Sequence, residues 1–310
     1  MFDLFAQLLP PASRWTDPLF RTDARGITWG SSWAALRTRM LRWGVQMLIV
    51  MLLSLIAFVI LRFLSVRGGS SSYYTPLSIL AEFLVFAFLG GVALNVILDF
   101  IAVSAGLGTI SGDFNMRRSD LIRLTLLRPT QIVESKHTLA QVRVLRMTYR
   151  IMWLRVWVVV MSVAALLWAW LDSLTRELSG LSTTSVFNVL VVLLVGVLSV
   201  FTYIAEPYWR MKAVTSMGVL VSARTMNGVS ATMNAGFTLI AFWFGQGFVI
   251  FFLLVVLQIM VAFTINEEWF FLIALFCCWA LITGAIYLFY AQISRNSLFQ
   301  AAYRLATIEN

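Results

Sequence analysis

The sequence predicts an all-α, polytopic membrane protein with six transmembrane helices, and three observations support that fold class. The chain of 310 residues is 60% hydrophobic and only 12% charged, whereas soluble domains carry roughly 25% charged residues. Apolar runs of about 20 residues recur along the chain, and each is long enough to cross about 30 Å of hydrocarbon. The runs are of helix length, whereas the strands of a membrane barrel alternate apolar and polar residues over about ten positions.

Six apolar runs are expected to cross the membrane. The fifth is longer than a straight crossing needs, so we expect it to tilt, break or bend back. Gly245 and Gly247 are the expected break points within it. The approximate bounds of the six spans are 45–64, 77–102, 151–171, 186–205, 237–265 and 269–293.

The basic residues determine the expected orientation. Of the 23 Lys and Arg residues, all except Arg62, Arg67 and Arg176 fall in the N-terminal segment, after the second and fourth spans, or in the C-terminal tail. Basic residues accumulate on the cytoplasmic side of membrane proteins. We therefore expect a multi-pass protein of the plasma (inner) membrane with both termini in the cytoplasm, which agrees with an even number of spans.

The N-terminal segment, residues 1–44, is expected to lie in the cytoplasm ahead of a transmembrane domain over residues 45–310. Within it, SSWAALRTRMLRW (residues 31–43) places large apolar side chains on one helical stripe and its arginines mostly off that stripe. That pattern is typical of an amphipathic helix lying in the inner membrane interface. The alternative is a helical extension of the first span. The stripe consists of Trp33, Leu36, Met40 and Trp43.

A charged cytoplasmic segment, residues 110–150, separates the second and third spans. Its stretch GDFNMRRSDLIRLTLLRPTQIVESK places Ser119 where it can cap a short helix rich in leucine. Pro129 ends that helix, because the residue before a proline is pushed out of the α region. Thr130 can then cap a second helix that continues through the third span. The alternative is that the arginines only set topology and contact anionic lipid head groups.

A second cytoplasmic stretch, residues 206–235, follows the fourth span. Pro207 lies just after the end of that span, and the remainder is small, polar and moderately apolar. We expect one or two short helices at the membrane surface here, since the stretch is too long for a hairpin turn and too short for a domain.

The sequence contains few residues suited to catalysis or to cofactor binding. His137 is the single histidine, and no glycine-rich phosphate-binding loop of the G-x-x-x-x-G-K-[ST] type occurs. Cys277 and Cys278 are adjacent within an apolar run, which suits packing rather than a disulfide or a metal site. Without such motifs, we expect no catalytic residue, cofactor or metal. We also expect no bound nucleic acid, because the basic residues lie where the orientation of a membrane protein requires them.

Polar residues inside the spans are costly in lipid, so each needs a partner or a role. Asp99 lies near the inner end of the second span, and Glu206 closes the fourth at the inner face. A proton or ion relay would need several acids at mid-membrane depth on facing helices. The true mid-span polar groups are Asn95, Gln246 and Gln258, for which structural hydrogen bonds are the expected role.

The charged segment resembles a known cytoplasmic hairpin. Its residues Ile110, Gly112 and Asp113, then Ser119-Asp120-Leu121-Ile122, Leu124-Thr125-Leu126-Leu127-Arg128-Pro129-Thr130, Ile132-Val133 and Lys136 are similar to the hairpin between spans two and three in permease subunits of type-2 ABC exporters. The short helix resembles the coupling helix, which in that family inserts into a cleft of the nucleotide-binding subunit. Glu206-Pro207 and the run from Gly218 to Arg224 resemble the family's second cytoplasmic segment.

The resemblance also has departures. Asp113-Phe114-Asn115 replaces an acidic-basic triplet, and Arg118-Ser119 replaces the usual Gly-Thr. The resemblance implies a permease that exports an amphipathic or lipid-like substrate, dimerises with an identical or homologous permease chain, and relies on separate P-loop ATPase subunits. The residues it assigns to ATPase coupling are Arg118, Asp120, Leu121, Arg123, Leu124 and Arg128, with Glu206, Arg210 and Arg224 in the second segment.

Two alternatives remain beside the permease. A non-catalytic structural subunit of a larger membrane complex would explain the lack of catalytic motifs equally well. A secondary carrier would be expected to show paired, interrupted helices in two halves of the chain, and no convincing internal repeat is visible in the sequence.

Overall fold

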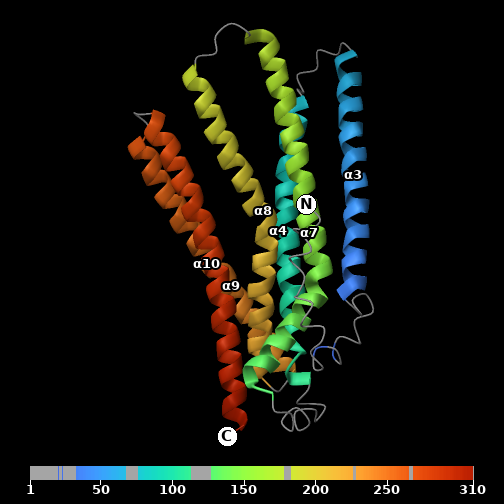
Figure 1. Cartoon of the computed structure of the whole chain (residues 1–310), viewed down its shortest axis with the longest axis vertical. Helices are drawn as coiled ribbons and strands as arrows, with labels where there is room; N and C mark the ends of the chain where they lie inside the picture. Colours follow the sequence, from blue (N-terminus) through green and yellow to red (C-terminus); the bar gives the residue numbers. More distant parts are fainter. Residues whose placement is uncertain are drawn as a thin grey trace.

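The computed structural model describes Phe20, Asp23 and residues 33–67, 76–112, 127–177, 183–225, 228–264 and 268–309. Within those residues the regular secondary structure is entirely helical, as the sequence predicted (Figure 1). The long helices are α3 (Trp33–Arg67), α4 (Pro76–Leu107), α7 (Pro129–Glu177), α8 (Thr183–Arg224), α9 (Gly228–Thr264) and α10 (Glu268–Glu309).

The helices α3, α4, α7, α9 and α10 each contain a stretch that is long and apolar enough to cross a membrane. The predicted fourth span forms the first part of α8. Many large apolar side chains are exposed, among them Leu53, Val197 and Phe248. Lipid rather than water is the solvent that suits such a surface. The structure is therefore that of a multi-pass helical membrane protein.

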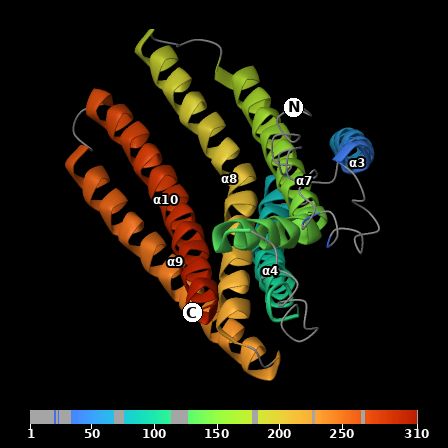
Figure 2. The same cartoon turned by 60° about the horizontal axis from the view of Figure 1, so that its bottom comes forward.

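Helix α8 lies at the centre of the bundle, in contact with α4, α7, α9 and α10. Helix α3 packs against α7 at one edge, and α9 with α10 lies at the other edge (Figure 2). The starts of α3, α7 and α9 and the ends of α4, α8 and α10 share one end of the molecule, at the bottom of Figure 1. We call it the basic end, since it carries most of the described Lys and Arg residues.

Several helices are too long for one membrane crossing alone. Helix α7 has 49 residues, and α8 and α10 have 42 each. At about 1.5 Å per residue, these lengths correspond to roughly 60–75 Å of helix, about twice the thickness of the hydrocarbon core. These helices therefore extend beyond the hydrocarbon core, and many of the buried residues of the bundle lie towards the basic end.

Residues 33–43 do not form a separate interfacial helix. They are the first turns of α3, which runs without interruption to Arg67. The structure therefore agrees with the second predicted alternative, a helical extension of the first span. The apolar stripe packs inward: Leu36 and Met40 are buried, and Trp43 packs against the same core. The Tyr149 hydroxyl donates to the Met40 carbonyl at 3.0 Å. The side chain of Trp33 lies outside the described part.

The expected helix end at Pro207 is also wrong. Helix α8 continues through this proline as far as Arg224, so residues 207–224 are not separate surface helices. A proline lacks the N–H that would bond the carbonyl four residues earlier, and here that carbonyl belongs to Tyr203. The Arg155 guanidinium donates to the Tyr203 carbonyl oxygen instead. A side chain from α7 thus replaces the missing backbone donor.

Helix α9 runs unbroken past both glycines at which a break was expected. Gly245 faces the ring of Phe289 on α10, where an added Cβ would lie 3.4 Å from the ring. An added Cβ at Gly247 would meet nothing within 4 Å. A glycine inside a helix weakens it without breaking it when neighbouring residues keep their hydrogen bonds.

The start of α7 differs slightly from the prediction. Pro129 is the first helical residue, where a proline needs no N–H partner, and Arg128 rather than Thr130 occupies the cap position. The Gln131 side-chain oxygen accepts the Arg128 N–H at 3.1 Å, which is one half of a capping box. The prediction that this helix continues through the third span is confirmed.

Helices α4 and α8 cross with their backbones in contact. A Cβ added at Gly106 would lie 2.8 Å from the Gly218 backbone, and one at Gly218 would lie 2.5 Å from the Val103 carbonyl oxygen. Only glycine fits both positions, as at other close crossings of membrane helices.

Substitution at this crossing is expected to destabilise the protein. Gly218→Ala should lower the free energy of unfolding by about 1–3 kcal/mol, because the added methyl group overpacks a backbone contact. Unfolding of the purified protein in mixed micelles of increasing denaturant content measures the change. Gly196→Ala on the same helix is the control: nothing lies within 4 Å of its added Cβ, so no loss is expected there. Equal effects of the two substitutions would contradict the close crossing.

Candidate functional site

Four charged side chains form a buried network in the half of the bundle nearer the basic end. Asp99 comes from α4, Arg155 from α7, and Glu206 and Arg210 from α8. Their side chains are between 1% and 14% exposed. Burying charges is costly unless they are paired and hydrogen-bonded, so the geometry of each pair matters.

The pair formed by Asp99 and Arg210 is bidentate. The Arg210 Nε donates to Asp99 Oδ1 at 2.8 Å, and Arg210 Nη2 donates to Asp99 Oδ2 at 2.5 Å. The indole N–H of Trp243 on α9 donates to the same Oδ2 at 2.8 Å. Such fork geometry gives the strongest class of charge-assisted hydrogen bond.

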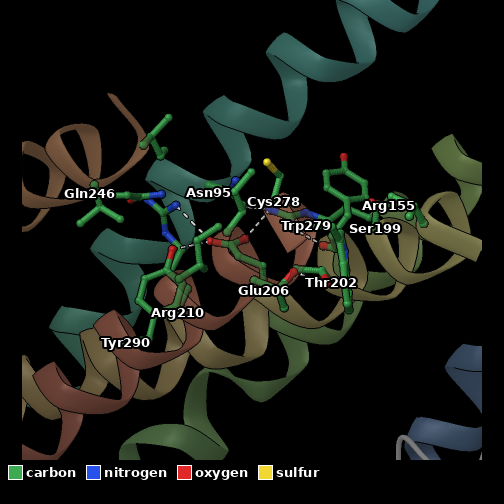
Figure 3. A pocket seen from close by; sticks show the side chains of 17 residues that line it. Asn95, Arg155, Ser199, Thr202, Glu206, Arg210, Gln246, Cys278, Trp279 and Tyr290 are labelled. Carbon is green, nitrogen blue, oxygen red and sulfur yellow. Dashed lines mark hydrogen bonds and ion pairs between the residues drawn. The ribbon is translucent and has the colours of Figure 1, made fainter. Parts of the chain in front are cut away.

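Glu206 accepts hydrogen bonds from two other helices and from a residue one turn along its own helix. Arg155 Nη2 donates to its Oε2 at 2.7 Å, and the Tyr290 hydroxyl of α10 donates to its Oε1 at 2.6 Å. Arg210 Nη1 lies 3.5 Å from Oε1, one helical turn along α8. Glu206 thereby connects both arginines to α10 (Figure 3).

Arg155 completes the network on the α4 and α7 side. Its Nη2 also donates to Asn95 Oδ1 of α4 at 3.0 Å. The guanidinium carbon lies 4.5 Å from the centre of the Tyr203 ring, in addition to the bond with the Tyr203 carbonyl. The network therefore joins α4, α7, α8, α9 and α10, and its two acids and two arginines have no net formal charge.

A cavity of about 480 Å³ lies beside this network, within the range of roughly 300–1,000 Å³ typical of ligand sites. Charged and aromatic hydroxyl groups line its end nearer the basic end. The remaining lining is mostly apolar, with the hydroxyls of Ser199, Thr202 and Thr283 and the amides of Asn95 and Gln246. Figure 3 shows these side chains converging from several helices. The lining residues are Asn95, Arg155, Val195, Ser199, Thr202, Tyr203, Glu206, Arg210, Gln246, Val249, Ile250, Cys278, Trp279, Ile282, Thr283, Ile286 and Tyr290.

The single histidine connects α7 to α8 through polar contacts. His137 is buried, and its Nε2 lies 3.1 Å from both the Lys212 carbonyl oxygen and the Thr215 hydroxyl. The first turns of α7, which include His137, cross α8 (Figure 2). The neighbouring Lys136 forms an ion pair with Asp23 at 2.6 Å. Among the described residues, no cluster of His, Cys, Asp and Glu could hold a metal ion.

A second apolar cluster lies at the basic end. It joins the ends of α4, α8 and α10 to the start of α7. Ser222 on α8 adds a polar contact: its hydroxyl oxygen accepts the N–H of Ile110 at 3.1 Å and that of Ser111 at 2.9 Å. Leu127 packs against the cluster as well. The buried members are Ile110, Ile132, Val133, Ala140, Val219, Leu220, Ala223, Ala301, Ala302 and Leu305.

The predicted coupling residues are largely outside the described part of the chain. Arg128 is exposed at the start of α7. The other five predicted coupling residues lie outside the described ranges: Arg118, Asp120, Leu121, Arg123 and Leu124.

The second predicted segment is divided by the structure. Glu206 and Arg210 lie in the buried network rather than on a surface, whereas Arg224 is exposed and donates to Gln300 at 2.5 Å. The sequence prediction did not include the network, because Arg155 stands among the basic residues that flank the third span. The sequence does place Asp99, Glu206 and Arg155 at a common depth, at the inner ends of three predicted spans, and that shared depth is a signal for such a network.

Comparison of the chain with protein-family models, with curated proteins and with solved structures gives no match. The fold and the site define a class, an α-helical membrane protein with a buried charge network beside a cavity. The likeness to an exporter permease rests on the quoted sequence motifs alone.

Removing one partner of the network should be strongly destabilising. Arg210→Gln leaves Asp99 buried without its main counter-charge, and we expect a loss of about 3–5 kcal/mol in the free energy of unfolding. The double variant Asp99→Asn with Arg210→Gln should recover a large part of that loss, since no unpaired charge remains. Denaturant unfolding in micelles measures both.

Arg224→Gln serves as the control for this cycle. Its exposed side chain predicts a change within about 0.5 kcal/mol. A double variant whose loss equals the sum of the two single losses would show that Asp99 and Arg210 are not coupled.

Proposed function

We propose that this chain is the membrane-spanning permease subunit of an ATP-driven transporter, with ATP hydrolysed on a separate subunit. The proposal includes six crossings and places the basic end, with both termini, in the cytoplasm of the plasma (inner) membrane. The positive-inside rule supports this orientation. The start of α3 and the end of α10 lie at the same end of the molecule, which agrees with an even number of crossings.

The observation that supports the proposal most is the contact between its two motif-bearing segments. Ile110 and Ser111 open the segment that resembles the coupling hairpin, and Ser222 belongs to the one that resembles the second cytoplasmic segment. They are bonded directly, at 3.1 and 2.9 Å. Both sides of the predicted coupling helix, Ile110 and Leu127, pack on the same apolar cluster. A force on residues 113–126 would therefore reach α4, α7, α8 and α10 together.

In this proposal the docked ATPase moves the coupling segment as ATP binds and is hydrolysed. Its arginines would meet an acidic edge of the ATPase cleft, and its leucines would fill an apolar floor. The long helices would transmit the movement as rigid bodies. A second permease chain, identical or homologous, would complete the pathway, and the cargo would be amphipathic or lipid-like.

A secondary carrier is the second candidate, because ionisable side chains line the cavity. The charge network would then move with a coupling ion rather than with ATP hydrolysis. Reconstituted vesicles separate the two candidates: transport that needs an ion gradient and no ATPase supports the carrier. A structural subunit would support no transport under either condition.

Charge reversal in the coupling segment should uncouple the transporter. Arg123→Glu with Arg128→Glu is expected to lower both retention of the ATPase subunit and its stimulated ATP hydrolysis by about tenfold, which corresponds to roughly 1.4 kcal/mol of docking free energy. The chain should still insert in the membrane, because neither residue lies in a span. ATP hydrolysis by the isolated complex in lipid nanodiscs is the measurement.

Arg295→Glu with Arg304→Glu is the matched control. Both side chains are exposed on α10, and the same change of charge there should leave ATP hydrolysis unchanged. Unchanged hydrolysis in the Arg123 and Arg128 variant would refute the coupling role.

A further inference from the structure

The cavity beside the charge network has a gradient of polarity along its length. Glu206 and Tyr290 lie at its charged end, whereas Val195 on α8 and Cys278 on α10 lie further into the apolar part. Val195 is about three turns of α8 from Glu206, which is roughly 16 Å. A ligand that follows this axis needs a polar head and an apolar tail.

Two N–H donors on the cavity wall lack a partner. Within the described structure, the buried Nε of Arg155 and the buried Nε1 of Trp279 make no hydrogen bond. The Arg155 side chain is only 5% exposed, so open solvent does not satisfy it. Buried donors without partners are rare and costly. Both residues line the cavity, so acceptor oxygens of a bound molecule could satisfy them.

The charge balance of the wall restricts the ligand further. Asp99 and Glu206 offset Arg155 and Arg210 in pairs of 2.5–3.5 Å. An additional buried charge would therefore have no counter-charge in the described wall, and an unpaired charge at this depth is costly. An uncharged head group with ester or hydroxyl oxygens avoids that cost and still accepts hydrogen bonds.

We propose that this cavity binds an uncharged amphiphile of the acylglycerol type. Its head oxygens accept from Arg155 at the charged end, and its acyl ester oxygen accepts from Trp279 further along the cavity. Its hydrocarbon tail lies beside Val195 and Cys278. Binding of the amphiphile does not require an ATPase. The further statement that this cavity is the entry site of transported cargo rests on the proposed permease function.

Photolabelling tests the binding site directly. The full chain in lipid nanodiscs is irradiated with a monolauroylglycerol that carries a diazirine in its tail, and labelled residues are mapped by mass spectrometry. We expect saturable labelling of the cavity-lining stretches around Val195 and Cys278. Unlabelled monolauroylglycerol should compete, laurate should compete about tenfold less well because of its charge, and dodecane should not compete.

Each other outcome overturns part or all of the proposal. Labelling confined to the exposed apolar faces, rising in proportion to probe concentration, would show ordinary lipid contact and no site. Laurate competing better than monolauroylglycerol would overturn the uncharged head group. Equal competition by dodecane would overturn any role for the polar wall.

A conservative substitution tests the role of the indole donor. Trp279→Phe keeps an aromatic ring and removes the N–H, so the competing concentration of monolauroylglycerol should rise about fivefold, the effect of one hydrogen bond of roughly 1 kcal/mol. Trp157→Phe is the matched control, since its indole donates to Ser54 at 2.7 Å and lies outside the cavity lining. If Trp279→Phe left the competing concentration of monolauroylglycerol unchanged, the Trp279 indole would not be a hydrogen-bond donor to the ligand.

The binding and transport proposals fail separately. Saturable labelling without any ATPase partner supports the site even if the chain proves to be a carrier or a structural subunit. ATP-stimulated transport together with labelling that is not saturable would support the permease and refute this binding site.

Discussion

The bidentate pair of Arg210 with Asp99 is the interaction on which the rest of the bundle depends. It places a positive group on the central helix α8 against a negative group on α4, and Trp243 of α9 donates to the same carboxylate. Glu206, one turn away, extends the network to α7 and α10. A buried network of this kind is costly when incomplete. It therefore specifies one arrangement of five helices.

The irregular features of the central helix fit around that network. Pro207 removes one backbone hydrogen bond of α8, and Arg155 uses the freed carbonyl of Tyr203 while it pairs with Glu206. Gly218 brings the next turns of α8 against the backbone of α4. These contacts make the half of the bundle nearer the basic end one packed unit, to which both motif-bearing cytoplasmic segments are attached.

The sequence predicted the helical class and the order of the long helices in the described part of the chain, because apolar length depends on local composition alone. It did not predict where the helices continue beyond the spans. The apolar stripe of Leu36 and Met40 is equally suited to lipid and to a neighbouring helix, and a proline ends a helix unless another group takes up the freed carbonyl. The buried network requires the depth and rotation of several helices at once, which a single sequence does not supply. Asp99 and Glu206 were recognised, but their arginine partners were not.

Isolation of the intact protein from its native membrane tests the docking role of the basic end most directly. The tagged chain is extracted in mild detergent, and the proteins that co-purify are identified and assayed for ATP hydrolysis. A permease should retain a P-loop ATPase in stoichiometric amount, together with a second permease chain. Recovery with redox or other structural subunits alone, and without ATP hydrolysis, would contradict the permease function.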